Sequence, residues 1–233
     1  MESPPRVRDD PGMFRDENGQ AIAEAALVLP AVLVLLLLTL QLTQLQRARI
    51  LVEAAAFSAA RAGIVLNGDP ARMQEAAAVA LLPGFGRTDS LAAVARTLAR
   101  FKAESARLEP LGLRMLRVHV HGPAASDFAT WGRHLDGQEI DFDDVRPGAA
   151  EATLLSLQVR HLCELRVPFA NRMIQTIWMA ARSGLPGKRH GAPDEVPLAA
   201  LAAAGETGRY YLPVEAFVTM RMQSNPYRKW ARP

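Results

Sequence analysis

The hydrophobic pattern of the chain is dominated by one stretch, which runs from Gly19 to Leu45. After Glu24 it contains no charged residue until Arg47, and only Pro30, Thr39 and Gln41 interrupt the apolar residues between positions 25 and 42. A helix needs about 20 apolar residues to cross the hydrocarbon core of a bilayer. The stretch therefore predicts one membrane-spanning helix, and the rest of the sequence contains no apolar run of similar length.

The helical pattern continues past the apolar stretch. No strong helix breaker occurs between Arg47 and Gly63, and residues with apolar or small side chains recur there at helical spacing: Ile50, Leu51, Ala54, Phe57, Ser58 and Ala62. We therefore expect one continuous helix from about Ile22 to about Ala62. Pro30 either kinks this helix or is absorbed locally, as membrane helices allow.

Two further helices are predicted after a turn at residues 67–70, Asn-Gly-Asp-Pro. The first covers residues 71–82, with Asp69 as its N-cap and Pro70 at its first position. Residues 83–86, Pro-Gly-Phe-Gly, end it. The second covers residues 89–108 and is amphipathic, with an apolar stripe made of Leu91, Val94, Leu98 and Phe101.

Three later segments alternate between apolar and polar residues with the period of a strand, and they cover residues 113–121, 153–167 and 212–223. Residues 122–150, rich in glycine and aspartate, are expected to form a long surface loop. Short helices are expected at 169–181 and 198–204. Strands with one polar face favour an antiparallel sheet, which would bury its apolar face against the soluble half of the long helix. The fold class is therefore α+β.

These elements divide the chain into three parts. We expect residues 1–19 to form a polar leader or tail, residues 20–63 the transmembrane and spine helix, and residues 64–233 an α+β domain. The net charge of +3 is dispersed along 233 residues, so we expect no nucleic-acid partner. A single cysteine, Cys163, excludes an intrachain disulfide.

The residues from Gly19 to Pro30 read GQAIAEAALVLP. This segment resembles the start of type IV pilin-like proteins, in which a prepilin peptidase cuts after a glycine and the fifth residue of the mature chain is glutamate. It looks most like the TadE-like pseudopilins of tight-adherence (Tad) pilus machineries, with matches at Glu24, Ala26, Leu27 and Pro30. Ala25 stands where that family often has an aromatic residue. The soluble region is far too long for a major Flp pilin.

The resemblance implies a pilin-like fold and a membrane-anchored minor pseudopilin that assists assembly of a Tad-type pilus or secretion filament. Cleavage would fall between Gly19 and Gln20. Glu24 and Pro30 would lie where the helix packs against other pilin-like helices. Placing a carboxylate near hydrocarbon costs free energy unless it pairs with a cation. The freed N-terminal amine of a neighbouring subunit could supply that cation.

The partners implied by the resemblance are other pilin-like subunits, the Tad assembly machinery, the prepilin peptidase and inner-membrane lipid. It also implies a cytoplasmic N-terminus and a periplasmic C-terminal domain. Arginines flank both ends of the apolar stretch, so the positive-inside rule leaves the orientation open.

Two alternatives remain open. The chain could be an uncleaved single-pass membrane protein with an extracytoplasmic binding or sensor domain, in which Glu24 is an ordinary residue near a helix N-terminus. It could also be an anchored hydrolase or metal-dependent enzyme, but no catalytic motif supports this class, so we expect no enzymatic activity.

No metal site and no cofactor are expected, because metal sites need three or four converging ligands. His119 and His121 fall on the polar face of their strand and are expected to be solvated. His161 and Cys163 fall on an apolar face and are expected to be buried in the core. Asp141, Asp143 and Asp144 are expected to form a solvated acidic loop, since they lack the spacing of a calcium-binding loop.

Overall fold

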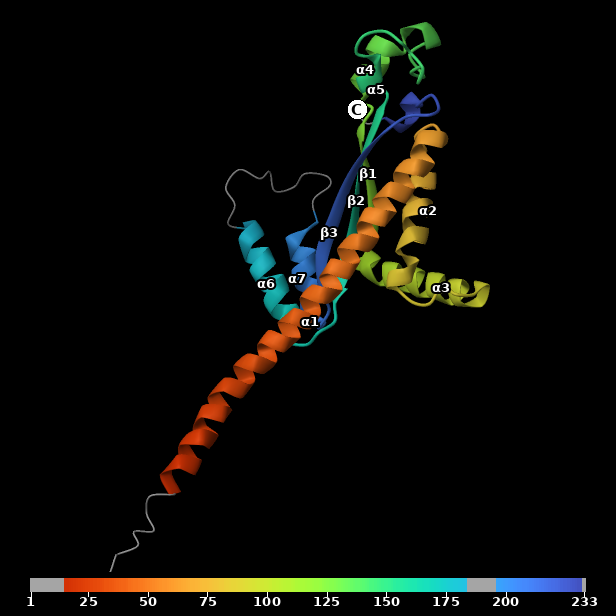
Figure 1. Cartoon of the computed structure of the whole chain (residues 1–233). Coiled ribbons are helices and arrows are strands. Elements are labelled where there is room, and N and C mark those ends of the chain that lie inside the picture. Colours follow the sequence, from red (N-terminus) through yellow and green to blue (C-terminus); the bar gives the residue numbers. More distant parts are fainter. Residues whose placement is uncertain (1–14, 184–195, 232–233) are drawn as a thin grey trace, which may run out of the picture.

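The computed structural model describes residues 15–183 and 196–231, and it confirms the predicted α+β architecture. A helix of 51 residues, α1 (Arg15–Val65), runs along the molecule, and its first half projects away from the rest of the fold (Figure 1). Its second half packs against a three-stranded antiparallel sheet and against α2 (Pro70–Leu81).

The first helix is longer than the sequence pattern predicts. It begins at Arg15 rather than near Ile22, and Pro30 lies inside it without ending it. The residues between Pro11-Gly12 and Gly19 contain no breaker, and a single glycine such as Gly19 costs a helix only about 1 kcal/mol. The helical backbone therefore includes residues 15–19, the last part of the segment that the pattern assigned to a leader.

The predicted helices after the turn are both present. Asp69 caps α2, and its carboxylate accepts a hydrogen bond from the backbone N–H of Ala71 at 2.9 Å. Ser90 caps α3 (Leu91–Leu108) in the same way through the N–H of Ala93. Phe101 is buried, as its place in the apolar stripe predicts. Leu91, in the first turn of α3, is exposed, so the prediction that it belongs to the packed side of the helix is wrong.

The sheet has the order β1 (Leu116–Gly122), β2 (Leu154–Leu165), β3 (Tyr210–Arg221), with antiparallel pairing throughout. Its apolar face and the second half of α1 form the core, to which both contribute fully buried residues: Val52, Ala55, Ala59 and Ala60 from the helix, and Leu155, Leu157 and Val159 from the central strand. Small alanines on α1 allow the helix to lie close to the sheet.

A glutamine side chain covers each outer edge of this sheet. Gln74 of α2 donates to the carbonyl of Leu116 and accepts from the N–H of Val118, both at 3.0 Å. Gln175, on α6 (Ala170–Ser183), donates to the carbonyl of Tyr211 in β3 at 3.3 Å. These contacts satisfy backbone groups that an edge strand would otherwise offer to another chain.

Residues 122–150 are not the long loop that their composition predicts. They contain α4 (Ala125–Trp131), a 3₁₀ turn (Arg133–Leu135) and the start of α5 (Ala149–Ala152). Phe128 and Ile140 are fully buried beneath them. This part lies at the end of the sheet farthest from the projecting half of α1 (Figure 1). Burial of Phe128 and Ile140 therefore folds this otherwise polar segment, and we call residues 122–150 the cap.

The segment that follows β3 closes the far end of α1. Ser224 donates its hydroxyl hydrogen to the carbonyl of Ile64 at 2.9 Å and accepts the N–H of Asn67 at 3.0 Å. The Asn67 side chain donates to the carbonyl of Asn225 at 2.8 Å. Polar groups at the end of a helix need partners outside it, and here they find them about 160 residues later in the chain. The last predicted helix is α7 (Leu198–Glu206), which packs on β3.

Candidate functional site

The first candidate site is the projecting half of α1. Its large apolar side chains are exposed, whereas the second half buries one face against the domain, with Val52 and Ile64 among the buried residues. The exposed residues of the first half are Ile22, Leu27, Val28, Leu29, Val32, Leu33, Leu35, Leu36 and Leu40. Among the described residues, α1 between Ala21 and Val65 is the one helix long and apolar enough to cross a membrane, and none of its most apolar window is buried. An exposed apolar surface of this size requires a cover of lipid or of other helices.

The sequence-predicted site residues all lie on this half of α1. Gly19 and Gln20 belong to its helical backbone, and Pro30 lies eleven residues after Gly19, which corresponds to about 16 Å along the axis. Glu24 is exposed and forms no hydrogen bond or ion pair with any other residue that the structure describes. Leu27 and Val28, one turn further, are exposed on the same side. The Glu24 carboxylate is therefore accessible to groups outside the described chain.

Gln41 marks the point where α1 enters the domain. Its side chain is fully buried, while its neighbours Leu40 and Leu42 are about half exposed. Its side-chain oxygen accepts a hydrogen bond from the backbone N–H of Val167 at 2.9 Å, and its side-chain nitrogen is buried without a hydrogen-bond partner. In the sequence, Gln41 is only a polar residue that interrupts the apolar run. A polar residue at such a position needs a hydrogen-bond partner, and the structure provides it at Val167.

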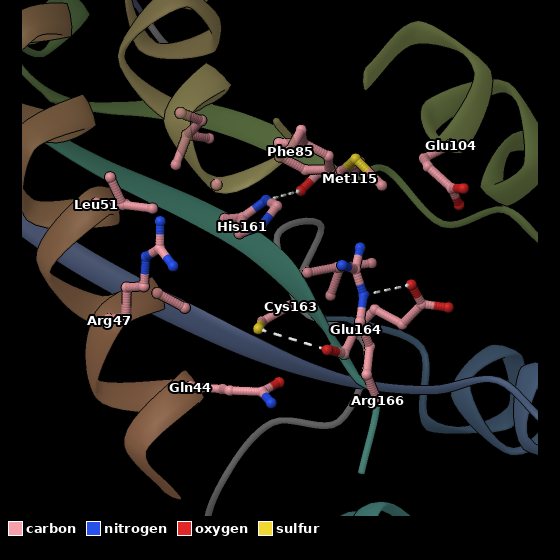
Figure 2. A pocket seen from close by; sticks show the side chains of 14 residues that line it. Gln44, Arg47, Leu51, Phe85, Glu104, Met115, His161, Cys163, Glu164 and Arg166 are labelled. Atoms are coloured by element: carbon pink, nitrogen blue, oxygen red, sulfur yellow. Dashed lines mark hydrogen bonds and ion pairs between the residues drawn. The ribbon is translucent and has the colours of Figure 1, made fainter. Parts of the chain in front are cut away.

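A second candidate site is an open pocket of about 330 Å³ that lies just beyond this level. In Figure 2, Gln44 and Arg47 extend from α1 toward residues of β2 and its end, among them His161, Cys163 and Arg166. Phe85 and Met115 line the opposite part of the wall. The pocket is open because β1 stops pairing at Leu116 with His161, so the last residues of β2 have no neighbouring strand on that side.

His161 is buried in the pocket wall, as its apolar position in the strand predicts. Its Nδ1 lies 3.0 Å from the carbonyl oxygen of Met115, so Nδ1 carries the hydrogen that is donated to this acceptor. Burial lowers the pKa of His161 to about 4. The side chain is therefore neutral at neutral pH and acts as a structural link between β2 and the segment before β1.

Cys163 is partly buried rather than a core residue, and it lines the open pocket. Burial raises the pKa of its thiol to about 11. A thiol with so high a pKa remains protonated and is a poor nucleophile. Glu164, next along the strand, pairs with Arg209 at 2.9 Å, and Arg209 also pairs with Glu104 of α3 at 2.9 Å.

His119 corrects the prediction that both histidines of β1 are solvated. His119 is 7% exposed, whereas His121 is exposed. The ring of His121 lies 4.4 Å from that of His119 and stacks near Phe217 of β3, and it also contacts the side chain of Gln158 at 3.2 Å. Side chains on the outer face of the sheet thus cover His119, which strand periodicity alone does not reveal.

The acidic segment at residues 141–146 is held by its own arginine. Arg146 donates to the carboxylate of Asp144 at 2.8 Å and stacks over Trp131 at 5.1 Å. This hydrogen bond lowers the pKa of Asp144 to about 2. The Asp144 side chain is only 6% exposed, so it is not the solvated acid expected from the sequence. Across the part of the chain that the structure describes, no three His, Cys, Asp or Glu side chains gather as metal ligands.

Comparison with known proteins agrees with the resemblance seen in the sequence. Residues 19–61 match the family model described as TadE-like protein. The matched segment covers the exposed half of α1 and the first part of its buried half, including Glu24, Pro30 and Gln41. Neither the curated proteins nor the solved structures contain a match to the chain.

Proposed function

We propose that this chain is a TadE-like minor pseudopilin, a non-enzymatic single-pass protein of the inner membrane that assists assembly of a Tad-type pilus or secretion filament. Its N-terminus would be cytoplasmic and its α+β domain periplasmic. One observation carries the proposal: a single uninterrupted helix leaves its first half exposed and apolar and packs one face of its second half against the domain. The match of residues 19–61 to the TadE-like family supports it.

The helix suits a role in assembly because it presents both an apolar surface and one carboxylate. Glu24 lies at the beginning of the apolar surface and lacks a partner among the described residues. Near hydrocarbon, an unpaired carboxylate is expensive. A neighbouring subunit cleaved between its own Gly19 and Gln20 would offer a primary amine at a similar depth. The pair would fix the axial position of one helix against the next.

The processing step is tested by mass spectrometry of the mature protein from cells that contain the prepilin peptidase. We expect an N-terminus at Gln20. Cells without the peptidase should yield the chain with residues 1–19 attached. An intact leader in the presence of active peptidase would contradict processing, and it would favour the uncleaved single-pass alternative.

The role of Glu24 is tested by photo-crosslinking from Leu27, which is 79% exposed one turn away on the same side of α1. We expect Glu24→Gln to reduce crosslinks to other pilin-like subunits severalfold, because the amide keeps the shape and loses the charge. Glu53→Gln is the matched control, since Glu53 is an exposed glutamate of the same helix that pairs with Arg49. Equal crosslinking in both variants would contradict the pairing.

The alternative, an uncleaved membrane protein with a binding or sensor domain, is favoured by the pocket between α1 and β2. The pocket combines apolar walls with Arg47 and Gln44, which would suit a small amphipathic ligand. Loss of assembly in cells that carry Glu24→Gln, with the pocket unaltered, would decide between the two functions.

A further inference from the structure

The helix α6 is apolar on two sides. Its inner side packs against the domain through Trp178 and Met179, and Gln175 is buried there with hydrogen bonds to the carbonyls of Leu201 and Tyr211. On the outer side, Met173 and Ile177 are 41% and 65% exposed, one helical turn apart. Phe169, just before the helix, is 72% exposed and extends the same spacing. We call these three residues the outer stripe.

The outer stripe starts near Gln41, where the exposed apolar part of α1 ends. The N–H of Val167 binds the side chain of Gln41, and Phe169 follows two residues later. Two residues span at most about 7 Å. The beginning of α6 is therefore held beside the exposed Leu40 and Leu42 of α1. Figure 1 shows α6 starting next to the middle of α1 and slanting away from it, with the sheet and the cap beyond.

The backbone before α6 supports a role for Phe169 outside the domain. Phe169 has a φ of 64°, in the left-handed region that bulky residues seldom adopt. Such strain persists where the surrounding structure requires it, and it is frequent at functional positions. Here the strained residue carries a large aromatic side chain that the domain itself does not cover.

The polar residues of α6 complete an interfacial pattern. Arg172 and Thr176 are exposed beside the stripe, so the outer surface has an apolar strip and a polar strip. Arg182 stacks over Trp178 with 5.3 Å between the guanidinium carbon and the ring centre. Exposed apolar side chains flanked by arginine on an amphipathic helix are typical of segments that lie in the headgroup region of a membrane.

We propose that α6 is an interfacial helix whose outer stripe inserts into the outer leaflet of the bilayer that α1 spans. The occupant of the stripe is lipid because the stripe begins two residues after Val167, which is held at Gln41 between the exposed Leu40 and Leu42 of the apolar part of α1. With two contacts, the span and α6, the membrane fixes the tilt of the domain relative to the bilayer as well as its height. The inference requires that α1 crosses the bilayer, and it does not require processing or pilus assembly.

The test uses the full chain in phospholipid vesicles, with Cys163→Ala to remove the native thiol and a nitroxide attached to a new cysteine. The sites compared are Ile177 and, as matched control, Phe217, which is 67% exposed on β3. We expect the label at position 177 to have a severalfold higher ratio of oxygen to nickel-complex accessibility than the label at 217. Equal ratios would overturn the proposal.

Two additions keep the outcome decisive. Dilution of the protein into excess lipid should leave the ratio at 177 unchanged, whereas a fall would show that a second copy covers the stripe and would overturn the proposal. If Cys163→Ala fails to fold, an Ile177→Trp substitution in the Trp131→Phe, Trp178→Phe, Trp230→Phe protein gives the same readout, through quenching of the new tryptophan by brominated lipid. Strong quenching supports the insertion and its absence refutes it, and neither result depends on cleavage after Gly19.

Discussion

The side chain of Gln41 accepts a hydrogen bond from the backbone of Val167, at 2.9 Å and across 126 positions of sequence. Gln41 lies in the last turns of the apolar part of α1, and Val167 lies in the link between β2 and α6. The contact therefore joins the exposed apolar half of α1 to the domain at the level of their boundary.

Gln41→Leu should leave the N–H of Val167 buried without an acceptor. An unsatisfied buried amide costs about 1–3 kcal/mol, and part of this cost is offset because the unpaired side-chain nitrogen of Gln41 is removed as well. We expect a net loss of about 1 kcal/mol and faster hydrogen exchange at Val167. Gln44→Leu, at an exposed position one turn later, should leave the exchange of Val167 unaltered.

Gly63→Ala should destabilise the joint between α1 and the sheet. A Cβ at this position would lie 2.6 Å from both Leu155 Cδ2 and Met73 Sδ. Overpacking of a core costs about 1–3 kcal/mol, which exceeds the gain in helix propensity. Denaturant unfolding of the full chain in detergent measures the change.

The control for that change is Gly205→Ala in α7, where the nearest atoms lie at an ordinary 3.4 Å. It should be neutral or stabilising by up to about 1 kcal/mol because alanine favours helix. Equal effects of the two substitutions would show that the close approach at Gly63 is absent.

The domain should lose stability as the pH falls from about 6.5 to about 4, because the pKa of buried His161 is lowered from 6.5 to about 4. Between these values the unfolded chain binds a proton at His161 that the folded chain does not. The loss can reach about 3 kcal/mol below the folded pKa. Thermal unfolding at several pH values measures it.

His161→Gln should flatten this part of the pH profile and lower stability at neutral pH, where the hydrogen bond to Met115 is weakened. His121→Gln is the control because His121 is exposed, and it should keep the slope. A slope that survives in His161→Gln would assign the pH dependence to other groups.

Arg209→Met should loosen the contact among α3, β2 and the start of β3. Arg209 is 31% exposed in its side chain and binds Glu104 and Glu164, which are 22% and 21% exposed. Hydrogen bonds to charged partners contribute about 1.5–3 kcal/mol each before screening, and partial exposure reduces this, so we expect a loss of about 1–2 kcal/mol. A double-mutant cycle with Glu164→Gln should give a coupling energy that falls at high salt, and an absent coupling would contradict the contact.

The elements with strong periodicity could be predicted from the sequence. The apolar run and the alanine-rich continuation gave α1, and the turn before Pro70 gave α2 with its cap at Asp69. Alternation in β2 and β3 gave the faces of the sheet. In each case the residues that bury surface repeat with the period of the element, so local sequence and tertiary packing demand the same conformation.

The cap at residues 122–150 and the burial of His119 could not be predicted, because both depend on contacts between distant segments. Phe128 and Ile140 stand singly in a polar segment, where no period identifies them as core residues. His119 is covered by side chains of β1 and its neighbours on the sheet. For the candidate site, Glu24 and Pro30 could be identified from the sequence. The pocket could not, because it forms where β1 begins only at Leu116, opposite His161, and the last residues of β2 have no partner strand on that side.

Because α1 is continuous, a change in the tilt of its apolar half also moves the domain. No flexible linker separates the apolar half from the domain, since the helix runs unbroken from Arg15 to Val65. The distance from Gln41 to Val65 corresponds to about 36 Å of helix axis, so a change of roughly 10° in the tilt of the span moves the far end of the domain by about 6 Å. If the exposed half spans a bilayer, bilayer thickness and the packing of adjacent helices would thus change the position of the cap.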